Sequence, residues 1–293
     1  MARSFAYGQR PDERGHWQRA RQPGQCVRVL ITGGTGGLGR AILASSRAKD
    51  VVLRAQSRRV APRDAAANVE WVRADLASGE GVWEAVAGVD AIIHAASDSR
   101  NAEAVDVEGT RRLVDAARAR GVRHVVFISI VGIDQIPFAY YQKKLAAESI
   151  VMSGGVPYSV LRATQFHSLV DGLISTAARM PLVIPLPTAF MVQSVATSEV
   201  ADRLVQALVD GPGGRLRDLG GPEVMTLGEA AAVWKDVTRV TKPVVSLPLP
   251  GRTAAAFRAG KNTAPDGERG TIRWRDWLIH GRRETSPPST APR

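Results

Sequence analysis

A glycine-rich turn near the start of the chain limits its fold more than any other stretch of the sequence. The apolar residues 27–32, rich in β-branched side chains, predict a strand, and residues 38–48 have a pattern typical of a helix. Between them the sequence runs Gly33-x-x-Gly36-x-x-Gly39. This spacing predicts a strand, a tight turn and a helix in direct succession.

The same three glycines suit the binding of a dinucleotide pyrophosphate. Gly33 can adopt the backbone angles of a sharp exit from the strand, Gly36 lets the main chain approach the phosphates, and Gly39 lets the helix pack on the strand. The N-terminus of the helix adds backbone N–H donors and the positive end of its dipole. An ordinary βα turn is the alternative. We predict a cofactor site at Gly33, Thr35, Gly36, Gly37, Leu38 and Gly39.

Length and composition exclude several other classes of protein. With 293 residues, 44% of them hydrophobic, the chain can bury a sizeable core. Its one cysteine, Cys26, cannot form an intrachain disulfide, and its five histidines are scattered singly, so we predict no metal site. No apolar run approaches the roughly 18 residues of a membrane span. Because the N-terminus also lacks the apolar segment of a secretory signal, we expect a cytoplasmic location.

The formal net charge of +11 raises the question of nucleic-acid binding. No basic run is interleaved with aromatic residues, and basic residues in the predicted helices alternate with acids, as around Asp115 and Arg118. This pattern favours a solvated surface over a nucleic-acid interface. We expect residues 1–26 and 282–293 to be a disordered basic leader and a disordered tail.

The end of the second predicted strand indicates which dinucleotide is bound. It reads Ser57-Arg58-Arg59, and no acidic residue occurs from 51 to 63. In nucleotide-binding folds this strand end meets the adenosine ribose. A carboxylate there would repel a 2′-phosphate, whereas a guanidinium matches it well. The sequence therefore favours NADP over NAD as the cofactor.

The ends of the next two predicted strands supply further candidates, an acid with a leucine at one and three small residues at the other. A strand over 69–76 ends in Asp75-Leu76, and one over 89–97 ends in Ala95-Ala96-Ser97. Small side chains at a strand end leave room for a flat ring or a ribose, although close packing of a neighbouring helix would explain them equally well. We include these five residues in the predicted cofactor site.

Two further strands place candidate catalytic and substrate residues. The continuous apolar run 124–132 suits a strand buried on both faces of a parallel sheet, and it ends near Ser129. A sixth strand over 156–163 leads into a loop at the carboxyl edge, where substrate mouths form in such folds. We expect that loop to contact substrate through Gln165, Phe166 and His167.

Tyr140 and Lys144 lie one helical turn apart and share one face of a predicted helix. A tyrosine hydroxyl has a reference pKa of about 10, and an adjacent ammonium lowers it by stabilising the phenolate. The pair is therefore a candidate acid/base for an alcohol or a carbonyl, and Ser129 could donate to the same oxygen.

Taken together, the motifs resemble the short-chain dehydrogenase/reductase superfamily. The chain looks most like its atypical or extended branch, which includes NmrA-like and nucleotide-sugar-epimerase-like NAD(P)-binding proteins. The resemblance spans residues 27–280 and rests on residues 32–39, Asp75-Leu76, His94–Ser97, Gly109-Thr110, Ser129 and Tyr140-x-x-x-Lys144.

This resemblance implies a role for each candidate residue. Tyr140 would exchange a proton with the substrate oxygen, Ser129 would position that oxygen, and Lys144 would hold the nicotinamide ribose and lower the tyrosine pKa. Asp75 would face the adenine, while Ala95 and Ala96 would line a ribose.

The chain departs from the family pattern in ways that leave two functions open. Asp106 stands where many extended members have asparagine, and Arg162-Ala163 replaces a common arginine-proline pair. Several NmrA-like relatives bind the dinucleotide without turnover. The chain is therefore either an oxidoreductase, moving hydride between NADP(H) and a carbonyl, alcohol or sugar carbon, or a dinucleotide-sensing regulatory protein.

The expected architecture is a Rossmann-type doubly wound parallel sheet with a small C-terminal substrate lobe. Residues 27–167 would form the NAD(P)-binding core, and residues 168–281 the remaining sheet elements and the lobe, with 168–192 as a flap. Thr226-x-x-Glu229 predicts a capping box at a helix start. We expect a small-molecule substrate as partner, and whether the chain forms a homodimer is left open.

Overall fold

The predicted parallel α/β sheet is present in the computed structural model, which describes residues 27–45, 51–58, 62 and 68–281. Its strands follow the order β13-β10-β6-β5-β4-β1-β2-β3, and β9 pairs with β6. The expected leader, the expected tail and Arg59 lie outside the described residues. The strands are β1 (Val27–Thr32), β2 (Val51–Ser57), β3 (Val69–Arg73), β4 (Ala91–His94), β5 (His124–Ile130), β6 (Tyr158–Ala163), β9 (Gly214–Arg215), β10 (Leu219–Gly220) and β13 (Glu268–Arg269).

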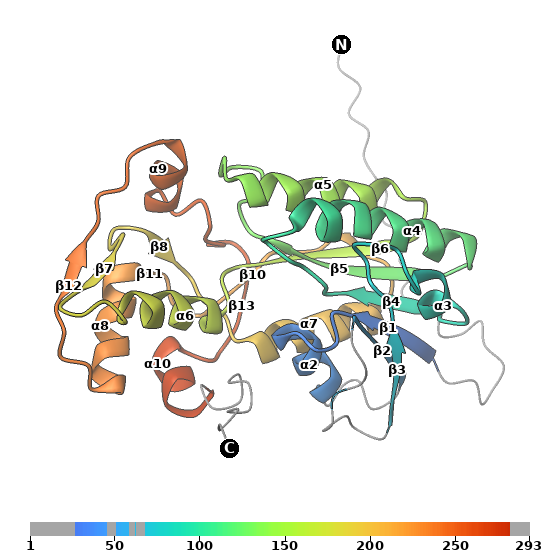
Figure 1. The fold of residues 1–293 in the computed structure, drawn as a ribbon, viewed down its shortest axis with the longest axis horizontal. Helices are drawn as coiled ribbons and strands as arrows, with labels where there is room; N and C mark the ends of the chain where they lie inside the picture. Colours follow the sequence, from blue (N-terminus) through green and yellow to red (C-terminus); the bar gives the residue numbers. More distant parts are fainter. Residues whose placement is uncertain (1–26, 46–50, 59–61, 63–67, 282–293) are drawn as a thin grey trace, which may run out of the picture.

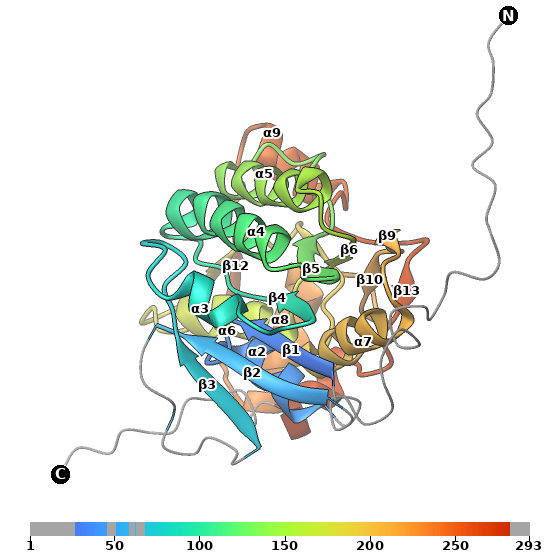
Figure 2. The same ribbon diagram turned by 90° about the vertical axis from the view of Figure 1, so that its right-hand side faces the viewer.

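Helices cover both faces of this sheet (Figures 1 and 2). Val29 and Ile31 of β1 point into the core beneath one helical layer, whereas Leu30 points to the other, and all three are fully buried. This burial on both faces explains the continuous apolar runs in the sequence. One layer contains α2 (Gly37–Ala44) and α7 (Thr197–Asp210); the other contains α3 (Val82–Val86), the π-helical turn η2 (Glu103–Glu108), α4 (Gly109–Ala119) and α5 (Ala139–Ser153).

The C-terminal lobe lies beside one end of the sheet (Figure 1). Trp234, Trp274 and Trp277 are the largest side chains of its apolar core. Two small sheets complete it, in which β12 pairs with β7 and β11 with β8. The lobe contains α6 (His167–Ala177), β7 (Ile184–Leu186), β8 (Met191–Val192), β11 (Met225–Thr226), α8 (Leu227–Thr238), β12 (Val244–Ser246), α9 (Arg252–Arg258), α10 (Trp274–Asp276) and η3 (Trp277–Gly281).

Two local predictions for this lobe had different outcomes. The capping box is confirmed, because Thr226 Oγ1 accepts from Glu229 N while Thr226 N donates to Glu229 Oε2. The expected flap over 168–192 is wrong for its first part, which is the helix α6. Val170 and Ile174, one turn apart, are buried against the lobe core, and this contact stabilises the helix.

The glycine turn joins β1 to α2 at very short range. Gly33 has a φ of +69°, which favours glycine, and a Cβ on Gly39 would lie 2.2 Å from the Gly33 carbonyl oxygen. A Cβ on Gly37, in the same helix, would meet no atom within 4 Å. The close approach of helix and turn therefore depends on Gly39.

Replacing Gly39 with alanine should lower the free energy of unfolding by about 1–3 kcal/mol, because the turn must move away from the new methyl group. The matched Gly37→Ala variant should be neutral or more stable by up to about 1 kcal/mol. Urea unfolding followed by circular dichroism measures both. Equal stability of the two variants would contradict the packing argument.

Candidate dinucleotide and proton-transfer site

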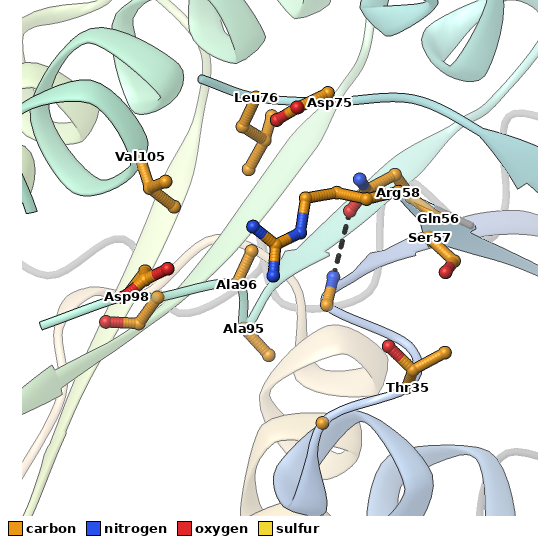
Figure 3. Close-up of a pocket in the computed structure, with 13 residues that line it drawn as sticks. Thr35, Gln56, Ser57, Arg58, Asp75, Leu76, Ala95, Ala96, Asp98 and Val105 are labelled. Carbon is orange, nitrogen blue, oxygen red and sulfur yellow. Dashed lines mark hydrogen bonds between the residues drawn. The ribbon is translucent and has the colours of Figure 1, made fainter. Parts of the chain in front are cut away.

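A pocket opens at the carboxyl ends of β1, β2 and β4 (Figure 3). It brings together ten of the predicted cofactor residues and three that the sequence did not single out. Gly37, Leu38 and Gly39 form the first turn of α2 and do not line the pocket. The predicted lining residues are Gly33, Thr35, Gly36, Ser57, Arg58, Asp75, Leu76, Ala95, Ala96 and Ser97; the additional ones are Gln56, Asp98 and Val105.

Gln56 ties the glycine turn to the neighbouring strands. Gly33 N donates to Gln56 Oε1 at 3.0 Å (Figure 3), and Gly34 N donates to the Gln56 carbonyl, also at 3.0 Å. The Gln56 side-chain amide in turn donates to the carbonyl of Ala74. In the sequence, the only indication that Gln56 has this role is that it is a polar residue within a buried strand.

The turn has the features that a bound pyrophosphate requires. Thr35, Gly36 and Gly37 are exposed, and no side chain caps the start of α2. The first-turn N–H groups of such a helix are natural donors to phosphate oxygens. Arg58 extends from the end of β2 over the same pocket (Figure 3). The residues present therefore fit a dinucleotide.

A buried histidine holds the floor of this pocket. Thr32 Oγ1 accepts from the backbone N–H groups of Ala95 and Ala96, both at 3.1 Å, and lies 2.7 Å from His94 Nδ1. His94 Nε2 lies 2.9 Å from Thr110 Oγ1. Burial, helped by the charge of Lys144, lowers the pKa of His94 to about 3, so the ring is neutral and links β1, β4 and α4.

Tyr140 takes part in a short hydrogen-bonded network with residues of η2 and of the loop that follows β4. Its hydroxyl lies 2.7 Å from Ser97 Oγ, which donates to Asp106 Oδ1 at 2.6 Å. Lys144 Nζ lies 3.4 Å from the same carboxylate oxygen, and Asp98 N donates to the other at 3.1 Å. Asp106 and Lys144 are 1% and 3% exposed, so this ion pair is buried.

The expected lowering of the Tyr140 pKa is not observed. Burial raises this pKa, the hydrogen bond with Ser97 opposes the rise, and the carboxylates of Asp106 and Asp98 add to it. Asp106 engages the Lys144 ammonium, which also lies 4.5 Å from the centre of the Phe127 ring.

Ser129 lies apart from Tyr140 in this network. It is buried and donates to Glu148 Oε2 at 2.5 Å. Glu148 also pairs with Arg162 through two hydrogen bonds, of 3.0 and 2.8 Å. The Ser129 proton is thus committed to Glu148, and the serine in contact with Tyr140 is Ser97, from the adjacent strand end. Glu148, four residues after Lys144, was not predicted.

The three predicted substrate residues connect β6 to the lobe. Both ring nitrogens of buried His167 have partners, Ser194 Oγ at 2.8 Å and the Ile272 carbonyl at 3.1 Å, and burial lowers its pKa to about 4. Gln165 donates to the Asn262 carbonyl and accepts from Gln193 N. Phe166 is half-buried against the main core. His167 therefore has the contacts of a structural residue rather than those of a substrate ligand.

The described residues contain neither a metal-ligand cluster nor a helix suited to a membrane. Within that part of the chain, no three His, Cys, Asp or Glu side chains gather as metal ligands. None of the helices placed in the structure combines the length and apolarity needed to cross a bilayer.

Comparisons with known proteins agree with this site. A family model described as NAD(P)H-binding matches residues 33–211. The Photosystem II assembly factor Ycf39 of Trieres chinensis is 30% identical over 168 residues, which are 54% of this chain and 51% of that protein. The chain thus spans about half the length of the first curated relatives that it matches.

Solved structures share the fold at low sequence identity. The NADPH-dependent quinone oxidoreductase QOR2 of Escherichia coli, in complex with NADPH, has a TM-score of 0.71 at 19% identity, covering 86% of this chain and 99% of that one. The triphenylmethane reductase of Citrobacter sp., in complex with NADP(H), has a TM-score of 0.62 at 21% identity, covering 87% and 95%. The family match covers more than half of the chain, so the protein belongs to the NAD(P)H-binding family.

Proposed function

We propose that the chain is an NADP(H)-dependent oxidoreductase that moves hydride between the nicotinamide and a carbonyl, alcohol or sugar carbon. The observation that carries this proposal is the position of Ser97, which lines the dinucleotide pocket and also contacts the Tyr140 hydroxyl at 2.7 Å. A proton donor thus lies at the edge of the pocket where the reacting part of the cofactor would be held.

The preference for NADP rests on Arg58. Arg58 follows Ser57 at the end of β2, where the adenosine ribose is bound in such folds, and its guanidinium extends over the pocket toward Ala96 (Figure 3). A guanidinium fork pairs well with a 2′-phosphate. NAD remains the second choice, because the contacts of the glycine turn are common to both dinucleotides.

Each residue of the site would contribute a separate part of the chemistry. When bound, the nicotinamide supplies or accepts the hydride. Tyr140 would give a proton to the substrate oxygen or take one from it. Lys144 would orient the nicotinamide ribose, as the family resemblance implies. Ala95 and Ala96, held by Thr32, would form a flat wall without long side chains. Ser129 has no part here, because its hydroxyl donates its hydrogen bond to Glu148.

A dinucleotide-binding regulatory or assembly protein is the second candidate. Ycf39, which resembles this chain over half its length, is named as an assembly factor. The commitment of Ser129 to Glu148 and the raised pKa of Tyr140 also favour this candidate, because they weaken the expected catalytic arrangement. QOR2 and the triphenylmethane reductase, whose names describe reductions, favour the first.

Arg58→Ala should weaken NADPH binding by roughly 10- to 100-fold and leave NADH binding nearly unchanged, because only NADPH has the 2′-phosphate. Calorimetric titration with each nucleotide measures both affinities. Arg73→Ala is the matched control, since this arginine is exposed at the end of the next strand and faces Glu80 instead of the pocket. An equal loss of affinity for the two nucleotides would contradict the assignment of Arg58.

Tyr140→Phe should reduce turnover at least about 100-fold while NADPH still binds, because only the proton donor is lost. The measurement is the loss of NADPH absorbance with a panel of quinones, aldehydes and ketones. Tyr141→Phe serves as the control, since Tyr141 is buried in an apolar cluster beside α9. NADPH binding without turnover of any compound would favour the assembly or regulatory protein. No binding of either nucleotide would exclude both candidates.

A further inference from the structure

We propose that Asp106 is a positioning residue for Tyr140. It accepts, through Ser97, the proton that the tyrosine exchanges. This inference rests on the proposed oxidoreductase function and adds the route of the proton to it. Three features of the site support it: the direction of the hydrogen bonds, the burial of the Asp106 carboxylate and the exposure of Ser97.

The directions of the hydrogen bonds in this network follow from counting protons. A carboxylate only accepts, so Ser97 Oγ donates its single proton to Asp106 Oδ1. Tyr140 must therefore be the donor in its 2.7 Å contact with Ser97. The chain of bonds runs from the phenol through the serine to the carboxylate, which is the alignment that proton transfer needs.

Transfer along this chain balances without any further reactant. The Tyr140 O–H bond breaks as an O–H bond forms at Ser97, and the original Ser97 O–H bond breaks as one forms at Asp106 Oδ1. The products are a phenolate and a neutral carboxylic acid, and the reverse steps return the proton to Tyr140. Because Ser97 is exposed, the proton can also exchange with solvent at this serine.

The carboxylate is held in place by three donors. Lys144 Nζ and Ser97 Oγ both contact Oδ1, and the Asp98 backbone N–H contacts Oδ2. Unpaired, a carboxylate with 1% exposure would be strongly destabilising. An asparagine at this position could still accept from Ser97, but it would carry no charge and could not take up the proton.

Other charged groups near this network are already paired. Glu103 of η2 and Lys143 of α5 form an exposed ion pair with each other. Glu148, which also faces Lys144, is bound by Arg162. Among the described residues, the carboxylates of Asp98 and Asp106 are the charges that raise the pKa of Tyr140. From α9, the apolar Phe257 packs beside the neighbouring Tyr141.

The test is the titration of Tyr140, read as tyrosinate absorbance in the ultraviolet and isolated by subtracting the Tyr140→Phe protein. Asp106→Asn should lower the pKa of Tyr140 by about one pH unit or more, because a facing negative charge is removed. Ser97→Ala should raise it, because the phenolate left after the transfer loses the Ser97 hydroxyl that then donates to it. Ser97→Thr, which keeps the hydroxyl, should restore the original value.

Opposite shifts from the two variants support the proposal, because Asp106 would then act on the phenol through its charge and Ser97 through its hydrogen bond. A Tyr140 pKa that stays the same or rises in Asp106→Asn would overturn it. Asp115→Asn, which removes an exposed carboxylate from α4, is the control and should leave the titration unchanged. Circular dichroism across the pH range restricts the comparison to folded protein.

The same preparations separate this proposal from the proposed function. Calorimetry with NADPH reports on the cofactor site, whereas the tyrosine titration needs neither cofactor nor substrate. If NADPH does not bind but the two variants shift the Tyr140 pKa in opposite directions, the oxidoreductase function is excluded and the proton route is still supported. NADPH binding and turnover without the shifts would keep the enzyme and exclude the role of Asp106.

Discussion

The buried ion pair between Asp106 and Lys144 is the constraint on which the site depends. Two charges removed from water are stable only when their remaining hydrogen-bonding capacity is also satisfied. Here Ser97 and the Asp98 backbone complete the carboxylate, and this requirement fixes the loop after β4 against η2 and α5. The π-helical turn of η2 fits this account, since such turns widen a helix locally and occur often at functional sites. Tyr140 is held at the pocket edge as a consequence.

A second set of buried charges lies behind the first and explains the fate of Ser129. Arg162 of β6 binds Glu148 and Asp134, and Glu148 also accepts a hydrogen bond from Ser129. Glu148 follows Lys144 by one helical turn, so α5 presents a cation and an anion on the same buried face. The two serines at neighbouring strand ends consequently have different tasks: Ser97 faces Tyr140 and the dinucleotide pocket, while Ser129 stabilises the buried pair.

The sequence predicts the sheet and the glycine turn well because both depend on local spacing. Residues 27–39 specify strand, turn and helix within one short segment, and the apolar runs at 91–94 and 124–130 specify buried parallel strands. The partners of Ser97, Ser129 and His167 could not be predicted in this way. Each depends on which side chain from a distant part of the chain lies nearest, and Asp106, Glu148 and Ser194 contact them only after β4, β5 and β6 are packed.

The buried charges also bear on the choice between the two candidate functions. A protein that only binds the dinucleotide needs the glycine turn, Arg58 and the small residues after β4, and it could use Lys144 to hold the ribose. It needs no buried carboxylate paired with that lysine behind Tyr140. Replacing such a pair with apolar side chains of similar volume is often neutral or stabilising. Apolar residues in place of Asp106 and Lys144 could therefore support the fold about as well as the ion pair does. A carboxylate joined to a phenol through one exposed hydroxyl does supply proton exchange, and that chemistry is useful to an oxidoreductase.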